Sequence, residues 1–134
     1  MAIRKRIGAL VPSTNTTAEG DYQLAAPGDV TIHGMRMWLT NEGLGTGESM
    51  DSMNAEIASG AKYLSTANVD AIAYLCTTGS FYKGAGWDKE MCDIIEQNSG
   101  VPGIATSPSA VEGLKQMGAK KVSIATPYPE WING

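Results

Sequence analysis

Segments with the pattern of buried β-strands alternate along this chain with segments that have the pattern of amphipathic helices. Five short apolar runs are typical of strands buried on both faces. They are Ile7–Val11, Val30–Met37, Ala71–Cys76, Gly103–Thr106 and Val122–Ala125. Alternation of this kind produces a parallel sheet whose crossover connections place helices on both faces. The sequence therefore predicts an α/β fold with an open parallel sheet of four to five strands in a flavodoxin-like order.

Four helices are predicted in the intervals between these runs. Thr16 and Glu19 have the spacing of a capping box, which predicts the start of the first helix. Ser107 as N-cap, Pro108 at the first helical position and Gly118 as the stop signal predict the bounds of the fourth. The apolar faces of the later helices are Met53, Ile57, Ala61 and Leu64, then Met91, Ile94 and Ile95, then Val111, Leu114 and Met117.

Composition narrows the class of protein. The 134 residues suit one ordinary domain, and 43% hydrophobic with 18% charged residues is typical of a folded chain. A net charge of −4 gives no basic footprint for nucleic acid, and no apolar run is long enough to span a membrane. We expect neither partner. With no secretory signal and no disulfide framework, Cys76 and Cys92 favour a cytoplasmic location.

One short internal similarity bears on domain organisation. Residues 5–12 and 120–127 both consist of a basic pair, an apolar strand and a proline. Two buried strands share such a pattern by chance, or a second copy of the fold begins at Lys120. We predict an N-terminal α/β domain over residues 1–119, and the first strand of a second, missing α/β half over residues 120–134.

Polar residues follow the carboxyl ends of the predicted strands, where open parallel sheets bind ligands. They are Pro12-Ser13-Thr14-Asn15-Thr16-Thr17 after the first run, Cys76–Ser80 after the third, Thr106-Ser107 after the fourth and Thr126–Tyr128 after the fifth. None of these residues is Asp, Glu, Lys or Arg. Neutral donors near helix N-termini suit a small anion. The alternative is that the same residues only cap the helices that follow them.

Cys76 is the strongest candidate for a catalytic nucleophile in the sequence. It ends a predicted buried strand and opens a Thr-Thr-Gly-Ser turn. Nearby N–H groups at such a turn lower the pKa of a thiol, and the thiolate is the nucleophile. The alternative is a small buried hydrophobe. We expect Cys92 to pack in the core and His33 to be structural; no metal-binding pattern surrounds them, so no metal site is expected.

Two predicted loops are partly similar to phosphate-binding motifs. Gly43–Gly47 is glycine-rich but lacks the Gly-Lys-Ser/Thr ending of a P-loop and follows the second strand. Ser13–Thr17 lies where a flavodoxin-type loop would, without a glycine for close approach. A flavodoxin-like module that binds phosphate or flavin stays an alternative. Residues Trp38–Met50 form a long predicted loop of the kind that binds ligands or closes as a lid.

Four motifs, in this order, resemble the aspartate/glutamate racemase superfamily, and most closely its maleate cis-trans isomerases and arylmalonate decarboxylases. They are Val11–Thr17, Cys76–Gly84, Thr106–Val111 and Ala125–Tyr128. The resemblance implies an enzyme without a cofactor, built from two similar α/β halves related by a pseudo-twofold axis. The active site lies between the halves, and each half offers one cysteine. By this resemblance the chain would correspond to the N-terminal half, or to a short protein that must pair to complete a site.

For an isomerase, the resemblance implies that the Cys76 thiolate adds to the double bond of maleate, the central bond rotates and fumarate is eliminated. The substrate-binding residues would be Pro12, Ser13, Asn15, Thr77, Thr78 and Tyr128. Arylmalonate decarboxylases have glycine at the position of Cys76, so the cysteine favours an isomerase over a decarboxylase. An amino-acid racemase is a further alternative.

The partners expected from this resemblance are a small carboxylate or dicarboxylate substrate and a second protein unit. A twofold homo-oligomer would imitate the two-half fold and place Cys76 of each copy opposite the other.

Overall fold

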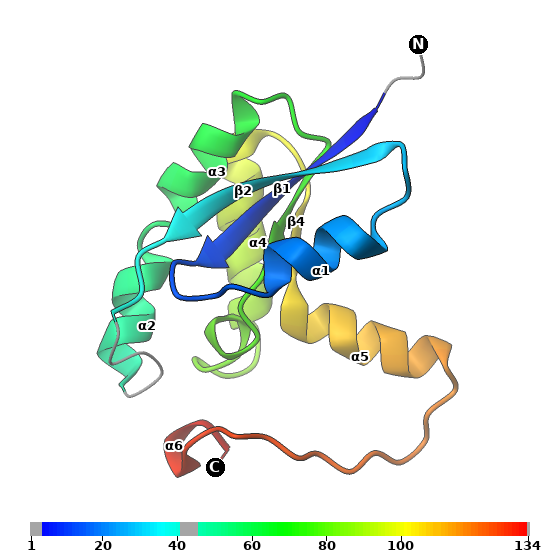
Figure 1. Ribbon diagram of the computed structural model, residues 1–134. Helices are drawn as coiled ribbons and strands as arrows, with labels where there is room; N and C mark the ends of the chain where they lie inside the picture. The colour runs from blue at the N-terminus through cyan, green and yellow to red at the C-terminus, as the bar shows by residue number, and fades with distance from the viewer. Residues whose placement is uncertain (1–3, 41–45, 134) are drawn as a thin grey trace.

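The computed structural model describes residues 4–40 and 46–133 and is shown in Figure 1. Its elements are β1 (Lys5–Pro12), α1 (Ala18–Ala25), β2 (Val30–Met37), α2 (Gly47–Asn54), α3 (Ile57–Ser65), β3 (Ala71–Tyr74), the 3-10 turn η2 (Thr78–Ser80), α4 (Trp87–Ser99), β4 (Gly103–Ala105), α5 (Thr106–Gln116) and α6 (Glu130–Asn133). The predicted alternation of strands and helices is confirmed through α5.

The four strands form one parallel sheet in the order β2-β1-β3-β4. β1 lies between its two neighbours, so that Ile7 pairs with Ile32 on one side and with Ala71 on the other. This is the predicted flavodoxin-like order. Because every strand runs in the same direction, the loops after all four begin at the same edge of the sheet.

Helices cover both faces of the sheet, as the alternation predicts. α1 lies against one face, and α3 and α4 lie against the other (Figure 1). Side chains along β1 alternate between the faces: Leu10 enters the larger core under α3 and α4, whereas Ala9 and Val11 enter a smaller cluster on the α1 face. The larger core holds most of the buried aliphatic and methionine side chains.

The single helix predicted through Met53 and Leu64 is wrong; the chain forms two helices. α2 ends at Asn54 and α3 begins at Ile57, yet the predicted apolar positions are buried in both. At the break, a carboxylate oxygen of Glu56 accepts the N–H of Trp38 at 3.1 Å. The periodicity survives the bend because the two helices present the same side to the sheet, so the pattern alone does not reveal the break.

Two predicted helix caps are also wrong. Asn15 Oδ1, and not a Thr16–Glu19 box, accepts the N–H groups at the start of α1. Glu19 pairs with Arg36 instead. α5 begins at Thr106, and the N–H and hydroxyl of Ser107 both bond to Ser80. The cap residue of α5 is Ala105, with no side-chain cap, because β4 leads directly into the helix.

The predicted stop of the fourth helix is confirmed. Gly118 follows α5 with a φ of 72°. Its N–H bonds to the carbonyl of Lys115, and the N–H of Ala119 bonds to the carbonyl of Leu114. This is a Schellman motif, which needs a residue in the left-handed region and so favours glycine.

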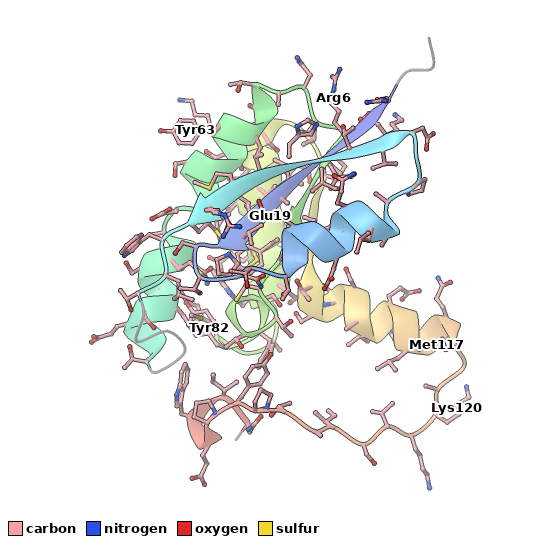
Figure 2. All side chains as sticks on the ribbon, viewed as in Figure 1. Arg6, Glu19, Tyr63, Tyr82, Met117 and Lys120 are labelled. Carbon is pink, nitrogen blue, oxygen red and sulfur yellow. The ribbon has the colours of Figure 1, made fainter. Side chains whose placement is uncertain are left out.

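The fifth predicted strand, Val122–Ala125, is wrong. It lies outside helix and strand, and Ile124 is 83% exposed. The reason is visible in Figure 1, where α5 leads away from β4 and leaves this segment beyond the sheet. The predicted apolar face of α5 is exposed for the same reason: Met117 is 76% exposed and points outward, as does Lys120 (Figure 2). The assignment of residues 120–134 to a second half stays a prediction.

The long loop predicted after β2 is shorter than expected, since α2 already begins at Gly47. Residues 41–45, which include most of the Gly43–Gly47 motif, lie outside the described residues, so a lid role for this loop stays a prediction. His33 lies within β2, where its Nε2 is 3.0 Å from the hydroxyl of Thr31. Across residues 4–40 and 46–133, no helix has both the length and the apolar character to cross a membrane.

Candidate active site

A cavity of about 270 Å³ opens at the edge of the sheet where the strands end. Its lining comes from the loop after β1, the residues after β2 and β3, and the C-terminal segment. The lining residues are Pro12, Thr14, Asn15, Leu39, Leu75, Cys76, Thr77, Thr78 and Tyr128. Six of the seven residues predicted from sequence thus meet around one space. The strand register explains this, because it brings the loops after β1 and β3 together.

Ser13 is the predicted residue that does not line the cavity. Its hydroxyl donates to the carbonyl of Leu39 at 3.2 Å and accepts the N–H of Leu39 at 2.9 Å. Ser13 therefore joins the chain after β1 to the chain after β2. This bond brings Leu39, a lining residue that the sequence analysis missed, to the cavity. A parallel pairing of β1 with β2 would have indicated it.

Cys76 stands two residues beyond the end of β3, at the start of a tight turn. Its Sγ accepts the N–H of Gly79 at 3.4 Å and lies beside the hydroxyl of Tyr74. Burial raises the pKa of the Cys76 thiol, and the Gly79 N–H and the Tyr74 hydroxyl lower it by less. The expected lowering by the turn is therefore wrong, because the turn directs one N–H to the sulfur while protein surrounds most of it.

The turn that holds Cys76 is fixed from within. The N–H of Ser80 bonds to the carbonyls of Cys76 and Thr77, and the Ser80 hydroxyl donates to the carbonyl of Thr77 at 2.7 Å. Ser80 is fully buried and Thr78 nearly so. The Ser80 hydroxyl also accepts the N–H of Ser107 at the start of α5. The backbone under Cys76 is thus held by both the turn and the following helix.

Asn15 caps the first helix from the loop after β1. Its Oδ1 accepts the N–H groups of Thr17 and Ala18, each at 2.9 Å, and so caps α1. With the oxygen bound to the helix, the amide nitrogen remains as the donor group of this side chain. The guanidinium of Arg36 donates to the carbonyls of Ser13 and Asn15 and pairs with Glu19. Arg36 thereby clamps the loop.

Tyr128 reaches the cavity from the C-terminal segment. Its ring lies against Phe81, with 6.1 Å between the ring centroids, and the amide of Asn133 donates to its carbonyl at 2.6 Å. No residue that lines the cavity carries a full charge, among the parts of the chain that the structure describes. Hydroxyls, an amide and a thiol surround the space. Such a wall of neutral donors suits a small anion.

Cys92 lies away from the cavity, in α4. It is partly buried and packs against the larger core, which agrees with the predicted packing role. The described residues hold no group of three or more His, Cys, Asp or Glu side chains arranged to bind a metal ion.

A sequence model of the arylmalonate decarboxylase family matches residues 11–134. The chain belongs to this family. The match begins at the end of β1 and includes every residue that lines the cavity. The resemblance carried by the four sequence motifs is therefore confirmed at the level of the family.

Individual proteins are similar to this chain over most of its length. Maleate isomerase from Geobacillus stearothermophilus is 30% identical, over 96% of this chain and 55% of that protein. A cysteine-to-alanine variant of the maleate isomerase Iso from Pseudomonas putida S16, solved with maleate, has a TM-score of 0.79 at 28% identity. That match covers 96% of this chain and 55% of the other. The chain thus spans about half the length of the relatives it matches.

A third relative shows chemistry at a cysteine. A mutant of the maleate cis-trans isomerase from Nocardia farcinica was solved with a covalently bound succinylcysteine intermediate. Its TM-score is 0.73 at 23% identity, covering 85% of this chain and 49% of the other. At this identity the likeness shows that the two chains share a fold.

Proposed function

We propose that this chain is the N-terminal half of a cofactor-independent isomerase that converts a small dicarboxylate of the maleate type through the Cys76 thiolate. The observation that carries the proposal is the position of Cys76 in a cavity whose other polar lining groups are neutral. Asn15 and Tyr128 would bind the carboxylates, with Thr77 and Thr78 as further donors, while Pro12 supplies part of the wall. Ser13 would hold the loop and not touch the substrate.

The proposed reaction needs no net input of protons or electrons. The Cys76 Sγ forms a bond to one alkene carbon, and the π electrons move toward the carboxylate on the other carbon. The central bond is then single and rotates. When the π bond forms again, the bond from carbon to Sγ breaks and the thiolate is restored. Donors fixed around the charged carboxylate stabilise this intermediate more than the substrate. The succinylcysteine of the Nocardia relative supports the bond between sulfur and carbon. In that adduct the second carbon also carries a proton, which would be taken up after the addition and released again before the elimination.

We also propose that a second α/β half completes the site. The supporting observations are the exposed apolar side chains of α5 and of the segment after it, together with relatives about twice as long. The half belongs to the same polypeptide in this proposal. A twofold pair of identical chains is the alternative arrangement. With a metabolite of this kind as substrate and two free cysteines, the cytoplasm is the proposed location.

Proton NMR with maleate tests the proposed activity in the native-length protein. We expect fumarate signals to grow, and Cys76→Ala to lower the rate by about 10⁴-fold or more because the nucleophile is gone. Cys92→Ala is the matched control, and we expect it to stay within about twofold of wild type, since Cys92 lies outside the cavity. A folded native-length protein that yields no fumarate would contradict the maleate reaction.

The family's own description makes decarboxylation the second candidate function. A malonate-type substrate would release carbon dioxide, whereas an amino-acid racemase would exchange the α-proton in heavy water. Proton NMR with each substrate distinguishes the isomerase, the decarboxylase and the racemase. The isomerase moves the alkene signals, the decarboxylase removes a carboxyl carbon, and the racemase exchanges the α-proton.

A further inference from the structure

A chain of hydrogen bonds runs from beside Cys76 through the interior to the surface. The Tyr74 hydroxyl, which lies beside the Cys76 Sγ at Gly79, donates to Oδ1 of Asn54 at 2.5 Å. The Asn54 amide donates to the hydroxyl of Tyr82 at 3.4 Å, and Tyr82 donates to Asp51 at 2.5 Å. Asp51 in turn pairs with Lys83 at 2.8 Å. Tyr82, near the outer end of this chain, is labelled in Figure 2.

The orientation of the Asn54 amide is fixed because one of its partners can only accept a hydrogen bond. Its amide nitrogen donates to the carbonyl of Gly79 at 3.3 Å, and a carbonyl cannot donate in return. Oδ1 of Asn54 must therefore face Tyr74. Since the Tyr74 proton is directed to Asn54, the hydroxyl must turn from Asn54 toward the sulfur before it can donate to a thiolate. Tyr74 is fully buried and Asn54 nearly so, so water does not replace either partner.

Gly79 completes the arrangement by leaving space for it. A Cβ at this position would lie 2.0 Å from the Tyr74 hydroxyl oxygen and 3.2 Å from the Cys76 Sγ. The contact between phenol and thiol thus occupies the volume that a side chain at position 79 would fill. The cavity chemistry described above uses neither Tyr74 nor Asn54, which lie behind the cysteine.

We propose that Tyr74 is a positioning residue for the nucleophile: held by Asn54, its hydroxyl directs the Cys76 thiol and then rotates to donate to the thiolate. This inference rests on the proposed function, since it assigns the pair a purpose in the addition step. The ionisable groups around the thiol are Tyr74 behind it and Tyr128 across the cavity. Tyr82, Asp51 and Lys83 act on it only through Asn54 and Tyr74.

Alkylation by iodoacetamide measures the thiolate without any substrate. The Cys76 Sγ bonds to the methylene carbon, iodide leaves and the thiol proton goes to solvent. Rates between pH 6 and 10 are read by mass spectrometry of the peptide that contains Cys76, in the native-length protein. We expect Tyr74→Phe to slow alkylation of Cys76 at neutral pH by about threefold to tenfold and to move the rise of the profile to higher pH. The loss of thiolate outweighs the greater nucleophilicity of a more basic sulfur.

Three controls separate positioning from a loss of packing. Cys92 in the same digest keeps its profile, and Tyr63→Phe, at an exposed tyrosine of α3, leaves Cys76 unchanged. The double variant Tyr74→Phe/Asn54→Leu removes both buried polar partners. Gly79 keeps the 2.8 Å bond from the indole N–H of Trp87 in that variant. We expect the double variant to fold and to show the same slow alkylation as Tyr74→Phe.

The opposite result overturns the proposal. If Tyr74 only fills space, the variants leave the alkylation rate of Cys76 unchanged, or raise it at every pH by exposing the sulfur. Isomerisation of maleate by the same proteins is measured separately. If Tyr74→Phe slows alkylation while the wild-type protein makes no fumarate, the proposed function is rejected and the role of Tyr74 at the thiol is kept. Unchanged alkylation with active wild type would reject the role of Tyr74 and keep the function.

Discussion

At the scale of single residues, two opposing influences act on the Cys76 thiol. Burial raises its pKa above the ordinary value of 9.0, and the Gly79 N–H and the Tyr74 hydroxyl oppose this. The raised pKa means that the neutral thiol predominates in the free protein at neutral pH. An alternating apolar pattern predicts that a strand ends near Cys76, but it does not report how many N–H groups the next turn directs at the sulfur.

We expect the pH dependence of turnover to follow this thiol. Because the reacting form is the thiolate, kcat/KM for maleate should rise by about tenfold per pH unit from pH 6 toward 9. It should level off only above 9, since the pKa in the folded protein is raised. Initial rates in buffers of equal ionic strength measure this. A profile already flat at pH 6 would contradict the raised pKa of the nucleophile.

Arg36 sets the position of Asn15, so its replacement tests the loop. Lysine lacks the fork that reaches the carbonyls of Ser13 and Asn15 and the Glu19 carboxylate together. We expect Arg36→Lys to raise KM for the dicarboxylate by about tenfold with a smaller effect on kcat. Steady-state kinetics provides the measurement, with Arg6→Lys as the matched control at the far end of β1. Equal KM values in the two variants would show that the clamp does not position Asn15.

At the scale of elements, the strands were predictable and the helix boundaries were not. The central strands β1 and β3 are short apolar runs that are buried on both faces, and the edge strands β2 and β4 continue the same alternation with helices. The break between α2 and α3 could not be predicted because the apolar period continues across it. The caps could not be predicted because Asn15 lies in a cluster of similar side chains and because Ser107 is bonded to Ser80.

Two glycines test how closely the elements pack. A Cβ at Gly103 in β4 would lie 2.8 Å from the carbonyl oxygen of Cys92 in α4, and that backbone has no room to move aside. We expect Gly103→Ala to lower the free energy of unfolding by about 1–3 kcal/mol. Gly113 has open space around it in α5, so Gly113→Ala should raise this energy by up to about 1 kcal/mol. Urea unfolding of both variants gives the answer, and effects of equal sign would contradict the packing.

At the scale of the whole molecule, the predictions fail for α5 and for the segment that follows it. The period of α5 predicts a buried face, and the run Val122–Ala125 predicts a strand, yet both are exposed. An apolar period indicates that a helix or strand has a face to bury, but it does not indicate which partner buries that face. The same limit applies to the site: the place of Cys76 after a buried strand was predictable from the residues, whereas the role of Tyr128 and a second half come only from the resemblance to a family, and they stay predictions.

The proposed second half makes a prediction for the intact protein. Mass spectrometry of the protein from its own host should give a chain about twice as long as 134 residues, with fumarate formed only by that long chain. If the mass corresponds to 134 residues, the single-chain arrangement is wrong. A dimer by light scattering, with activity that depends on protein concentration, would then support the paired arrangement.

The way Asn15 is held has a consequence for the ligands that this wall accepts. Because its oxygen is bound to the first turn of α1, the side chain cannot turn over and present an acceptor to the cavity. Under the proposed function, Asn15 would therefore meet a carboxylate oxygen as a donor and never as a second acceptor. The bond that starts the first helix would in this way also set the polarity of the site.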